Sequence, residues 1–224
     1  MVIGNVTINY TASNDLNLPS GLTTYGDLTV NAPDATVNNR SIVTGTITIN
    51  KVSKNTWNEL TTGNSLVFKT KGGKLNIGKN VTVGCLTLDA ENATLNVSDH
   101  AYLIYPVAIN KTVTIITSKP ITAIVDKGVK VIVKANKNED GKEVIGTGDE
   151  IKFYPPVDKT DLISAINNAV DIKKDDYTIE TWDFFEDALN AAKEVNKKEN
   201  VTKDEIDKAI RFLNIAKEGL VQKI

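Results

Sequence analysis

The sequence has few of the residues on which several classes of site depend. Its 224 residues include one Cys, one Met and one His. One Cys cannot form an internal disulfide, and one Cys with one His cannot complete a zinc site. Lys71–Lys74 is glycine-rich but lacks the spacing and the following helix of a phosphate-binding loop. No metal site and no cofactor is therefore predicted.

Strong charge and long apolar runs are also missing. The chain has 26 Lys and Arg against 28 Asp and Glu, for a net charge of −2. This balance leaves no broad basic face, so nucleic acid is not an expected partner. No run approaches the length of apolar sequence that spans a bilayer, so no membrane span is predicted. Met1–Gly4 shows no signal peptide, which leaves the localisation open.

The composition changes near residue 155. Residues 1–155 are rich in Thr, Asn, Val and Ile, of which Thr, Val and Ile favour strands. Residues 156–224 are rich in Ala, Leu, Lys, Glu and Asp, most of which favour helices. Pro155 and Pro156 lie between the two parts and favour an extended connector. We therefore predict a β domain over 1–155 and a helical domain over 156–224.

The β part contains an internal repeat. Residues 26–38 recur as residues 84–96 with a constant offset of 58 and no gap. This offset divides into three coils of about 19–20 residues, at the short end of the periods of repeat proteins. Short alternating strands closed by Gly, Asn and Asp turns favour a parallel β-helix, with a β-sandwich of hairpins as the alternative. The side chains expected to point inward are Leu28, Val30, Val37, Leu86, Leu88 and Leu95.

Two stretches of the β part depart from this repeat. A hairpin is predicted near 128–146, because Asp140-Gly141 is a strong turn signal between two alternating runs. We interpret this hairpin as the cap of the last coil, since an open coil exposes unpaired backbone groups. Residues 51–64 break the repeat and are expected to leave the coil as a loop or short helix that carries Trp57.

The apolar periodicity of the helical part indicates three amphipathic helices joined by short links, and this arrangement predicts an antiparallel bundle. Asp158 or Thr160 is the expected cap of the first helix, and Thr178 of the second. Thr202 with Glu205 forms a capping box at the start of the third. The apolar positions recur every three or four residues: Leu162, Ile163, Ile166 and Val170; Trp182, Phe185, Leu189, Ala192 and Val195; Ile206, Ala209, Ile210, Leu213, Ala216 and Leu220.

Residues 157–224 resemble the FIVAR module over nearly its whole length. The resemblance rests on Val157–Thr160, Tyr177–Thr178 with Trp182 and Phe185, and Val201–Ile210 with its following apolar positions. Thr181-Trp182 stands where many relatives have Ser-Trp. The resemblance implies an extracellular or cell-wall-associated bacterial protein. In such a protein the module has a binding role, with glycans or host matrix proteins as ligands, or a spacer role. Residues 1–155 are only generally similar to the pectate-lyase-type solenoids of bacterial surface proteins.

Exposed aromatic rings are the candidate binding residues. The flat apolar face of a sugar can lie on such a ring while nearby polar groups bind its hydroxyls. Trp57 is the first candidate because of its expected place in a loop, although the favoured interpretation of this ring is structural, as one that pins that loop or plugs a solenoid end. The other candidates are Tyr10, Tyr25, Tyr102 and Tyr105 in the β part, and Phe184 and Phe212, which the helical stripe does not explain.

No catalytic residue is predicted. His100 and Cys85 lack partners that would activate them. The turn acids are not kept between the two copies of the repeat: Asp34 aligns with Asn92, and Asp89 with Asn31. The sequence therefore favours a non-catalytic scaffold or adhesive region that binds glycan or matrix protein on a bacterial surface. A fragment of a polysaccharide lyase or hydrolase, with its groove along the coil, is one alternative, and a passive stalk is the other.

Overall fold

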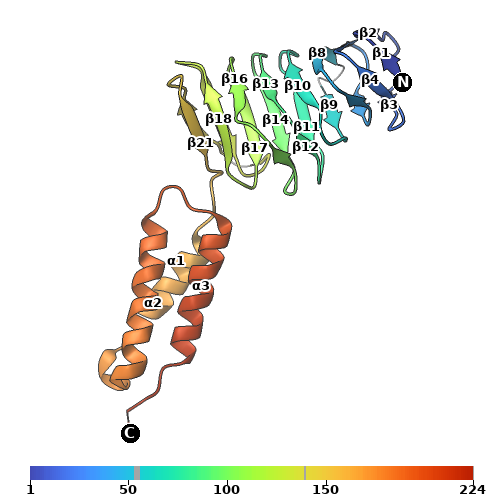
Figure 1. Cartoon of the computed structure of the whole chain (residues 1–224). Helices are drawn as coiled ribbons and strands as arrows, with labels where there is room; N and C mark the ends of the chain where they lie inside the picture. The colour runs from blue at the N-terminus through green and yellow to red at the C-terminus, as the bar shows by residue number, and fades with distance from the viewer. Residues whose placement is uncertain (53–55, 139, 224) are drawn as a thin grey trace. The chain divides into compact units, whose positions relative to one another are not determined.

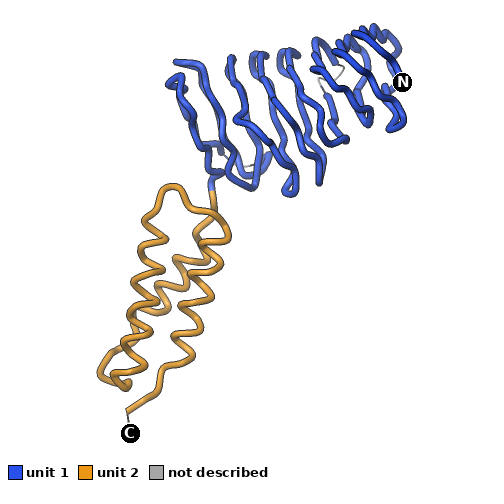
Figure 2. Tube along the Cα trace, in the orientation of Figure 1, with its two compact units in different colours: residues 1–156 blue, residues 157–224 orange. Residues whose placement is uncertain are grey.

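The chain forms two compact units, residues 1–156 and residues 157–224 (Figure 2). The computed structural model describes residues 1–52, 56–138 and 140–223. Each unit has its own hydrophobic core, and the two cores share no residue. The units are therefore described separately.

Unit 1 is a β-solenoid of about six turns, in which strands of successive coils pair in parallel (Figure 1). The prediction of a parallel β-helix is confirmed, and the alternative of a β-sandwich is wrong. One long sheet contains, in spatial order, β2 (Val6–Asn9), β5 (Leu28–Ala32), β8 (Thr46–Val52), β10 (Ser65–Phe68), β13 (Leu86–Leu88), β16 (Val107–Ile109), β18 (Ile121–Val125) and β21 (Glu150–Phe153).

A second long sheet and two short ones form the other sides of the solenoid. The second long sheet contains β20 (Lys142–Ile145), β19 (Lys130–Lys134), β17 (Val113–Thr117), β14 (Ala93–Val97), β11 (Lys74–Ile77), β9 (Thr56–Glu59), β6 (Val37–Asn39) and β3 (Leu16–Leu18). The short sheets contain β1 (Val2–Ile3), β4 (Thr23–Tyr25) and β7 (Ile42–Val43), and β12 (Thr82–Val83) with β15 (Tyr102–Leu103).

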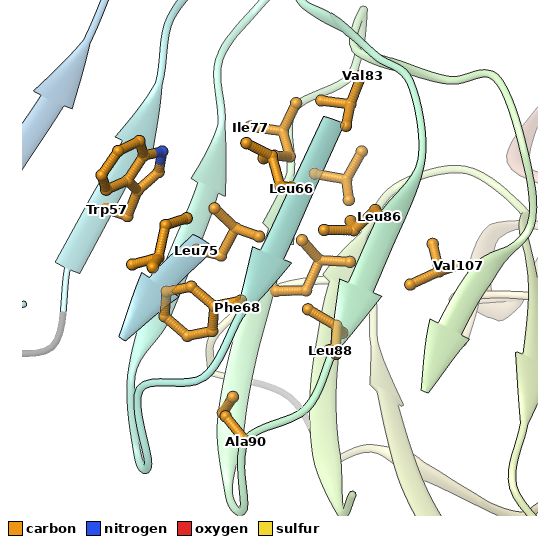
Figure 3. Packing of buried hydrophobic residues seen from close by; sticks show 14 of the residues in the cluster. Trp57, Leu66, Phe68, Leu75, Ile77, Val83, Leu86, Leu88, Ala90 and Val107 are labelled. Carbon is orange, nitrogen blue, oxygen red and sulfur yellow. The ribbon is translucent and has the colours of Figure 1, made fainter. Parts of the chain in front are cut away.

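The alternating sequence of each strand builds the core. In β5 and β14 every second residue is buried, as the period of two of an extended chain requires. The register of the strands aligns the inward apolar residues of neighbouring coils: Leu28 lies opposite Ile47, and Leu66 lies opposite Leu86. Figure 3 shows Leu66 and Leu86 packed with other aliphatic and aromatic side chains between the strands. All six side chains predicted to point inward are buried.

Glycine at the start of the repeat marks a corner where coils stack too closely for a side chain. A Cβ on Gly26 would lie 2.6 Å from the carbonyl oxygen of Gly4, and one on Gly45 would lie 2.6 Å from that of Gly26. Gly26 also has a φ of +140°, which L residues rarely adopt. A side chain is therefore excluded from this corner at Gly26 and Gly45, whereas Asn64 takes the equivalent position in the next coil.

Two antiparallel strands end the stack. β20 pairs with β19, with Lys130 opposite Ile145, and β21 pairs with β18, with Ile121 opposite Phe153. Residues 130–145 thus contain a hairpin, of whose turn residue 139 lies outside the described residues. These strands reverse the parallel order at the C-terminal end of both long sheets.

The stretch expected to leave the coil continues it instead. β8 and β9 bracket residues 53–55, which lie outside the described residues, and β9 pairs in parallel with β6 and β11. Trp57 is fully buried in β9, so its prediction as an exposed ring in a loop is wrong. The reason is that Trp57 takes the inward position of its coil, between Val37 and Leu75.

An outward row of asparagines, which we call the asparagine ladder, runs along the second long sheet. Each amide Nδ2 donates to Oδ1 of the asparagine in the preceding coil, over 2.5–3.0 Å. The row ends at Asn96, because Ile116 stands opposite it in the next coil. Oδ1 of Asn96 is buried and has no donor among the described residues. The ladder comprises Asn17, Asn38, Asn58, Asn76 and Asn96.

Replacing Ile116 with Asn should extend the asparagine ladder by one hydrogen bond. We expect the free energy of unfolding of Ile116→Asn to exceed that of Ile116→Ala by about 0.5–1.5 kcal/mol, because the new side-chain amide would donate to the unpaired Oδ1 of Asn96. Urea unfolding of both variants measures the difference. Ile116→Asp is the matched control, since it has the same shape without the donor and should rank below Ile116→Asn. Equal stability of the Asn and Ala variants would contradict this account.

Unit 2 is a bundle of three α-helices over residues 157–223, which confirms the predicted fold. Its helices are α1 (Thr160–Val170), α2 (Ile179–Lys197) and α3 (Lys203–Glu218), with a short 3₁₀ helix, η2 (Lys174–Asp176), before α2. The apolar stripes of α2 and α3 face the core as predicted. In α1, however, Ile163 and Val170 are exposed, and Ala169 is buried in their place. The buried face of α1, formed by Leu162, Ile166 and Ala169, is therefore narrower than the apolar face predicted from the sequence.

The helix caps match the predictions in part. Thr202 and Glu205 form the predicted capping box at α3, since Oγ1 of Thr202 accepts from the Glu205 amide and the Glu205 carboxylate accepts from the Thr202 amide. Thr178 is the cap residue of α2, but its hydroxyl pairs with Thr181. Lys159 occupies the cap position of α1, and Asp158 accepts from the amide and hydroxyl of Thr160.

Candidate functional site

A pocket of about 470 Å³ lies on the solenoid near its C-terminal end. Four parts of the chain line it: Val97 of β14, residues 102–106, residues 119–122 of the next coil, and Glu150 of β21. Glu150 reaches this position because β21 pairs with β18, where it lies opposite Ile124. The pocket therefore depends on the antiparallel strand that ends the first long sheet.

Two predicted binding residues, Tyr102 and Tyr105, line this pocket together. Tyr102 takes an outward position in β15, and 68% of its surface is exposed. Tyr105 follows the same strand and is 57% exposed. Ile104, which lies between them, is also exposed and lines the pocket. The solenoid thus presents two aromatic rings and an aliphatic side chain to solvent at one place.

Lys119 supplies an amine at the pocket. Its Nζ donates to the carbonyl of Ala101 and lies 4.7 Å from the centre of the Tyr102 ring. Partial burial lowers the pKa of Lys119, while the nearby Asp99 carboxylate acts in the opposite direction. Asp99 also accepts a hydrogen bond from Ser118. Lys119 therefore holds the Tyr102 ring through a cation–π contact and places a donor beside it.

This combination suits a ligand with both apolar faces and hydroxyl groups. Tyrosine rings offer flat apolar surface, and their hydroxyls, the Lys119 amine and the Glu150 carboxylate offer both donors and acceptors. A sugar has this dual character, because C–H groups cover one face of the ring and hydroxyls surround it. The pocket can therefore bind such a molecule by stacking and hydrogen bonding.

The other predicted binding residues lie elsewhere. Phe184 of α2 and Phe212 of α3 form an edge-to-face pair with ring centres 5.3 Å apart, and both are partly exposed. Tyr25 is exposed in β4 and does not line the pocket. Trp57 is inside the solenoid, as described above. Tyr10 is partly buried against the solenoid core and does not line the pocket. The structure thus brings four of the seven candidates together as two pairs, leaves Tyr25 apart and buries Trp57.

Cys85 and His100, the other side chains considered for catalysis, do not line this pocket. Cys85 is exposed and unpaired, as predicted, and His100 is exposed in a turn. Among the described residues, no three His, Cys, Asp or Glu side chains are grouped to hold a metal ion. The acids considered in the sequence, Asp34, Asp89, Glu91 and Asp99, lie at separate turns or strand ends.

One carboxylate is buried inside the solenoid. Glu59 is fully enclosed in β9 and accepts from Nδ2 of Asn39, Nδ2 of Asn64 and Nε1 of Trp57, over 2.9–3.1 Å. Oδ1 of Asn39 in turn accepts from the amide and hydroxyl of Ser41. Burial raises the pKa of Glu59, and these hydrogen bonds oppose the rise. This polar cluster links two neighbouring coils from within the apolar core.

Sequence reasoning missed Lys119, Glu150 and the Glu59 cluster. Lys119 follows Ala101 by about one coil, so the coil period alone could have predicted that Lys119 lies next to Tyr102. No local signal marks Glu150, which enters through antiparallel pairing. Glu59 is two residues from Trp57 and so faces inward with it, but a carboxylate at an inward position looks like an interruption of the apolar pattern of a strand.

Comparison with known proteins identifies the helical unit. Residues 158–221 match the FIVAR domain family. The comparison with curated proteins gave no match, and the comparison with solved structures gave none either. No helix in the described ranges has the length and apolar character needed to cross a bilayer. A FIVAR domain points to a bacterial cell-surface protein. Residues 158–221 of this chain are a FIVAR domain, and a β-solenoid precedes it.

Proposed function

We propose that this chain is a non-catalytic, adhesive region of a bacterial surface protein, in which the solenoid pocket binds a glycan. The observation that carries the proposal is the pairing of exposed Tyr102 and Tyr105 in one pocket with Lys119 and Glu150. Two rings at one place give apolar surface that a monomeric soluble protein rarely leaves exposed without a use. The FIVAR domain supports the extracellular setting in which a glycan would be met.

Flat rings with polar neighbours favour a sugar over a purely apolar ligand. The lining combines the two rings with polar side chains, and Lys119 lies beside the Tyr102 ring. Lys119 donates to the Ala101 carbonyl and contacts the Tyr102 ring, so these two side chains support each other before a ligand binds. A preformed aromatic site loses little conformational entropy on binding. The proposal therefore assigns stacking to the tyrosines and orientation to Lys119 and Glu150.

Replacing both tyrosines with alanine should abolish most of the binding. We expect Tyr102→Ala with Tyr105→Ala to weaken binding at least about tenfold, because each tenfold loss corresponds to about 1.4 kcal/mol and a buried aromatic contact supplies more. Calorimetric titration with hyaluronan, polygalacturonate and chitin oligosaccharides measures the affinity. Tyr25→Ala is the matched control, since Tyr25 is as exposed but lies outside the pocket, and its affinity should not change.

The same polymers separate the alternatives. Binding that survives in the double variant would contradict the assigned site. If none of the polymers binds the unchanged chain, the solenoid acts as a spacer and the proposal is wrong. Turnover of a polymer that Asp99→Asn abolishes would instead support a lyase or hydrolase.

A further inference from the structure

A second groove of about 440 Å³, which we call the ladder groove, lies where the asparagine ladder ends. Asn76, Asn96 and Ile116 line it from β11, β14 and β17. The turns that follow β14, β17 and β19 complete the lining with residues 98–99, 118 and 135–137. These four strands are neighbours in the second long sheet, and three strand spacings cover about 14 Å. The ladder groove is therefore longer than a single sugar ring.

The ladder groove has the same dual chemical character as the pocket. Ile116 takes an outward position at which the preceding coils have asparagines, so it gives aliphatic surface among amides. Ser118 and Lys137 are exposed and offer a hydroxyl and an amine. This mixture suits the C–H face and the hydroxyls of a sugar. Since none of its described lining residues is aromatic, however, the ladder groove offers no stacking surface of its own.

The pocket and the ladder groove adjoin at one corner of the solenoid. Val97 lines both of them. Ser118 of the ladder groove directly precedes Lys119 of the pocket, and its hydroxyl donates to the Asp99 carboxylate. Asp99 also attracts the Lys119 amine. This hydrogen bond joins the turn after β14 to the turn after β17, so a ligand in the pocket has the ladder groove as its direct neighbour.

We propose that the ligand is an unbranched oligosaccharide that continues from the pocket, past the hydrogen bond between Asp99 and Ser118, into the ladder groove. This inference rests on the proposed glycan-binding function and adds the class of glycan: a chain bound along its length, and not a single terminal sugar. One sugar stacks on the tyrosines of the pocket, and the sugars that follow contact Ile116 and Lys137. Because one ligand joins the two sites, contacts too weak to bind a sugar alone add to the affinity of the pocket.

The length of the glycan tests this inference on the full chain. Calorimetric titration compares oligosaccharides of hyaluronan, polygalacturonate and chitin, each from the disaccharide to the hexasaccharide. For the polymer that binds, we expect the affinity to rise at least about tenfold over the series, because the longer chains gain the contacts of the ladder groove. Equal affinity for the disaccharide and the hexasaccharide would overturn this inference and leave the proposed function standing. If no oligosaccharide binds, the proposed function is wrong, and this inference fails with it.

A variant of the ladder groove separates these contacts from the statistical gain of a longer chain. Ile116→Ala with Lys137→Ala should lower the affinity for the hexasaccharide at least about fivefold and leave that for the disaccharide unchanged. Ile132→Ala with Lys127→Ala is the matched control, since both side chains lie outside the pocket and the ladder groove, and it should bind both ligands as the unchanged chain does.

The affinity for the disaccharide also reports whether the altered solenoid keeps its pocket. If the double variant loses both ligands, Lys137→Ala alone, at an exposed position, must still weaken binding of the hexasaccharide at least about twofold and spare the disaccharide. Unchanged binding of the hexasaccharide in the double variant would overturn the inference, as would an equal loss of the hexasaccharide in the matched control.

Discussion

Glu59→Ala is expected to destabilise the solenoid by about 2–6 kcal/mol. Removal of the carboxylate leaves Nδ2 of Asn39 and Nε1 of Trp57 without an acceptor in a fully buried site, and each orphaned donor costs about 1–3 kcal/mol. Asn64 loses one acceptor but still donates to the carbonyl of Ser41. A loss of this size is a large part of the stability of a domain.

Fluorescence can isolate this effect. The chain has two tryptophans, one in each unit, so a Trp182→Phe background leaves Trp57 as the reporter of the solenoid. Urea unfolding in that background compares Glu59→Ala with the unchanged position. Glu91→Ala is the control, because Glu91 is an exposed turn carboxylate and its loss should cost less than about 0.5 kcal/mol. Similar midpoints for the two variants would contradict the structural role of Glu59.

The cost of Glu59→Ala should also depend on pH. Burial raises the pKa of Glu59 in the folded chain above its ordinary value of 4.5. The folded state therefore keeps this proton to higher pH than the unfolded state does, so the resulting stability is present in acid and is lost as pH rises through the raised pKa. The difference between the unchanged chain and the variant should shrink above about pH 4.5. A pH-independent difference would show that the carboxylate does not titrate inside the fold.

Phe185→Ala is expected to unfold the helical bundle. Phe185 is fully buried in α2, with its ring centre 5.3 Å from that of Trp182. Truncating a buried phenylalanine costs about 3–5 kcal/mol, and the core of a domain this small rarely supplies more than that. The helical circular dichroism signal should fall at room temperature, while the β signal of the solenoid remains.

The neighbouring phenylalanine is the matched control. Phe184 is 47% exposed and contacts Phe212 at the surface of the same helices. Phe184→Ala removes the same atoms and should cost only about 0.5–1.5 kcal/mol, the value of an edge-to-face pair. A comparable loss of helical signal in both variants would show that burial does not separate these two positions.

The solenoid was predictable because its coils repeat the same chemistry. The ungapped copy of residues 26–38 defined the coil length, and strand alternation then identified Leu28 and Leu86 as core. Trp57 was misplaced because local pattern does not show what satisfies an inward carboxylate. Glu59 accepts from the Trp57 indole, from the side-chain amide of Asn64 five residues away, and from that of Asn39 in another coil. A polar side chain at a core position depends on partners that only the folded coils bring together.

The proposed glycan pocket was predictable only in its aromatic part. Tyr102 and Tyr105 stand out as large rings in a sequence with few of them. Lys119 and Glu150 join them through stacking of one coil on the next and through the antiparallel pairing of β21. In the bundle, the exposure of Ile163 shows the same limit, since a helical stripe defines which side is apolar but not how wide the packed face is.

Parallel stacking has a mechanical consequence for a protein exposed to shear at a cell surface. The backbone hydrogen bonds between neighbouring coils run along the solenoid axis, and each coil contacts only the coils beside it. Tension applied through the first and last strands is therefore resisted by one coil at a time. The solenoid should lengthen under load in small steps, each releasing a single turn of chain.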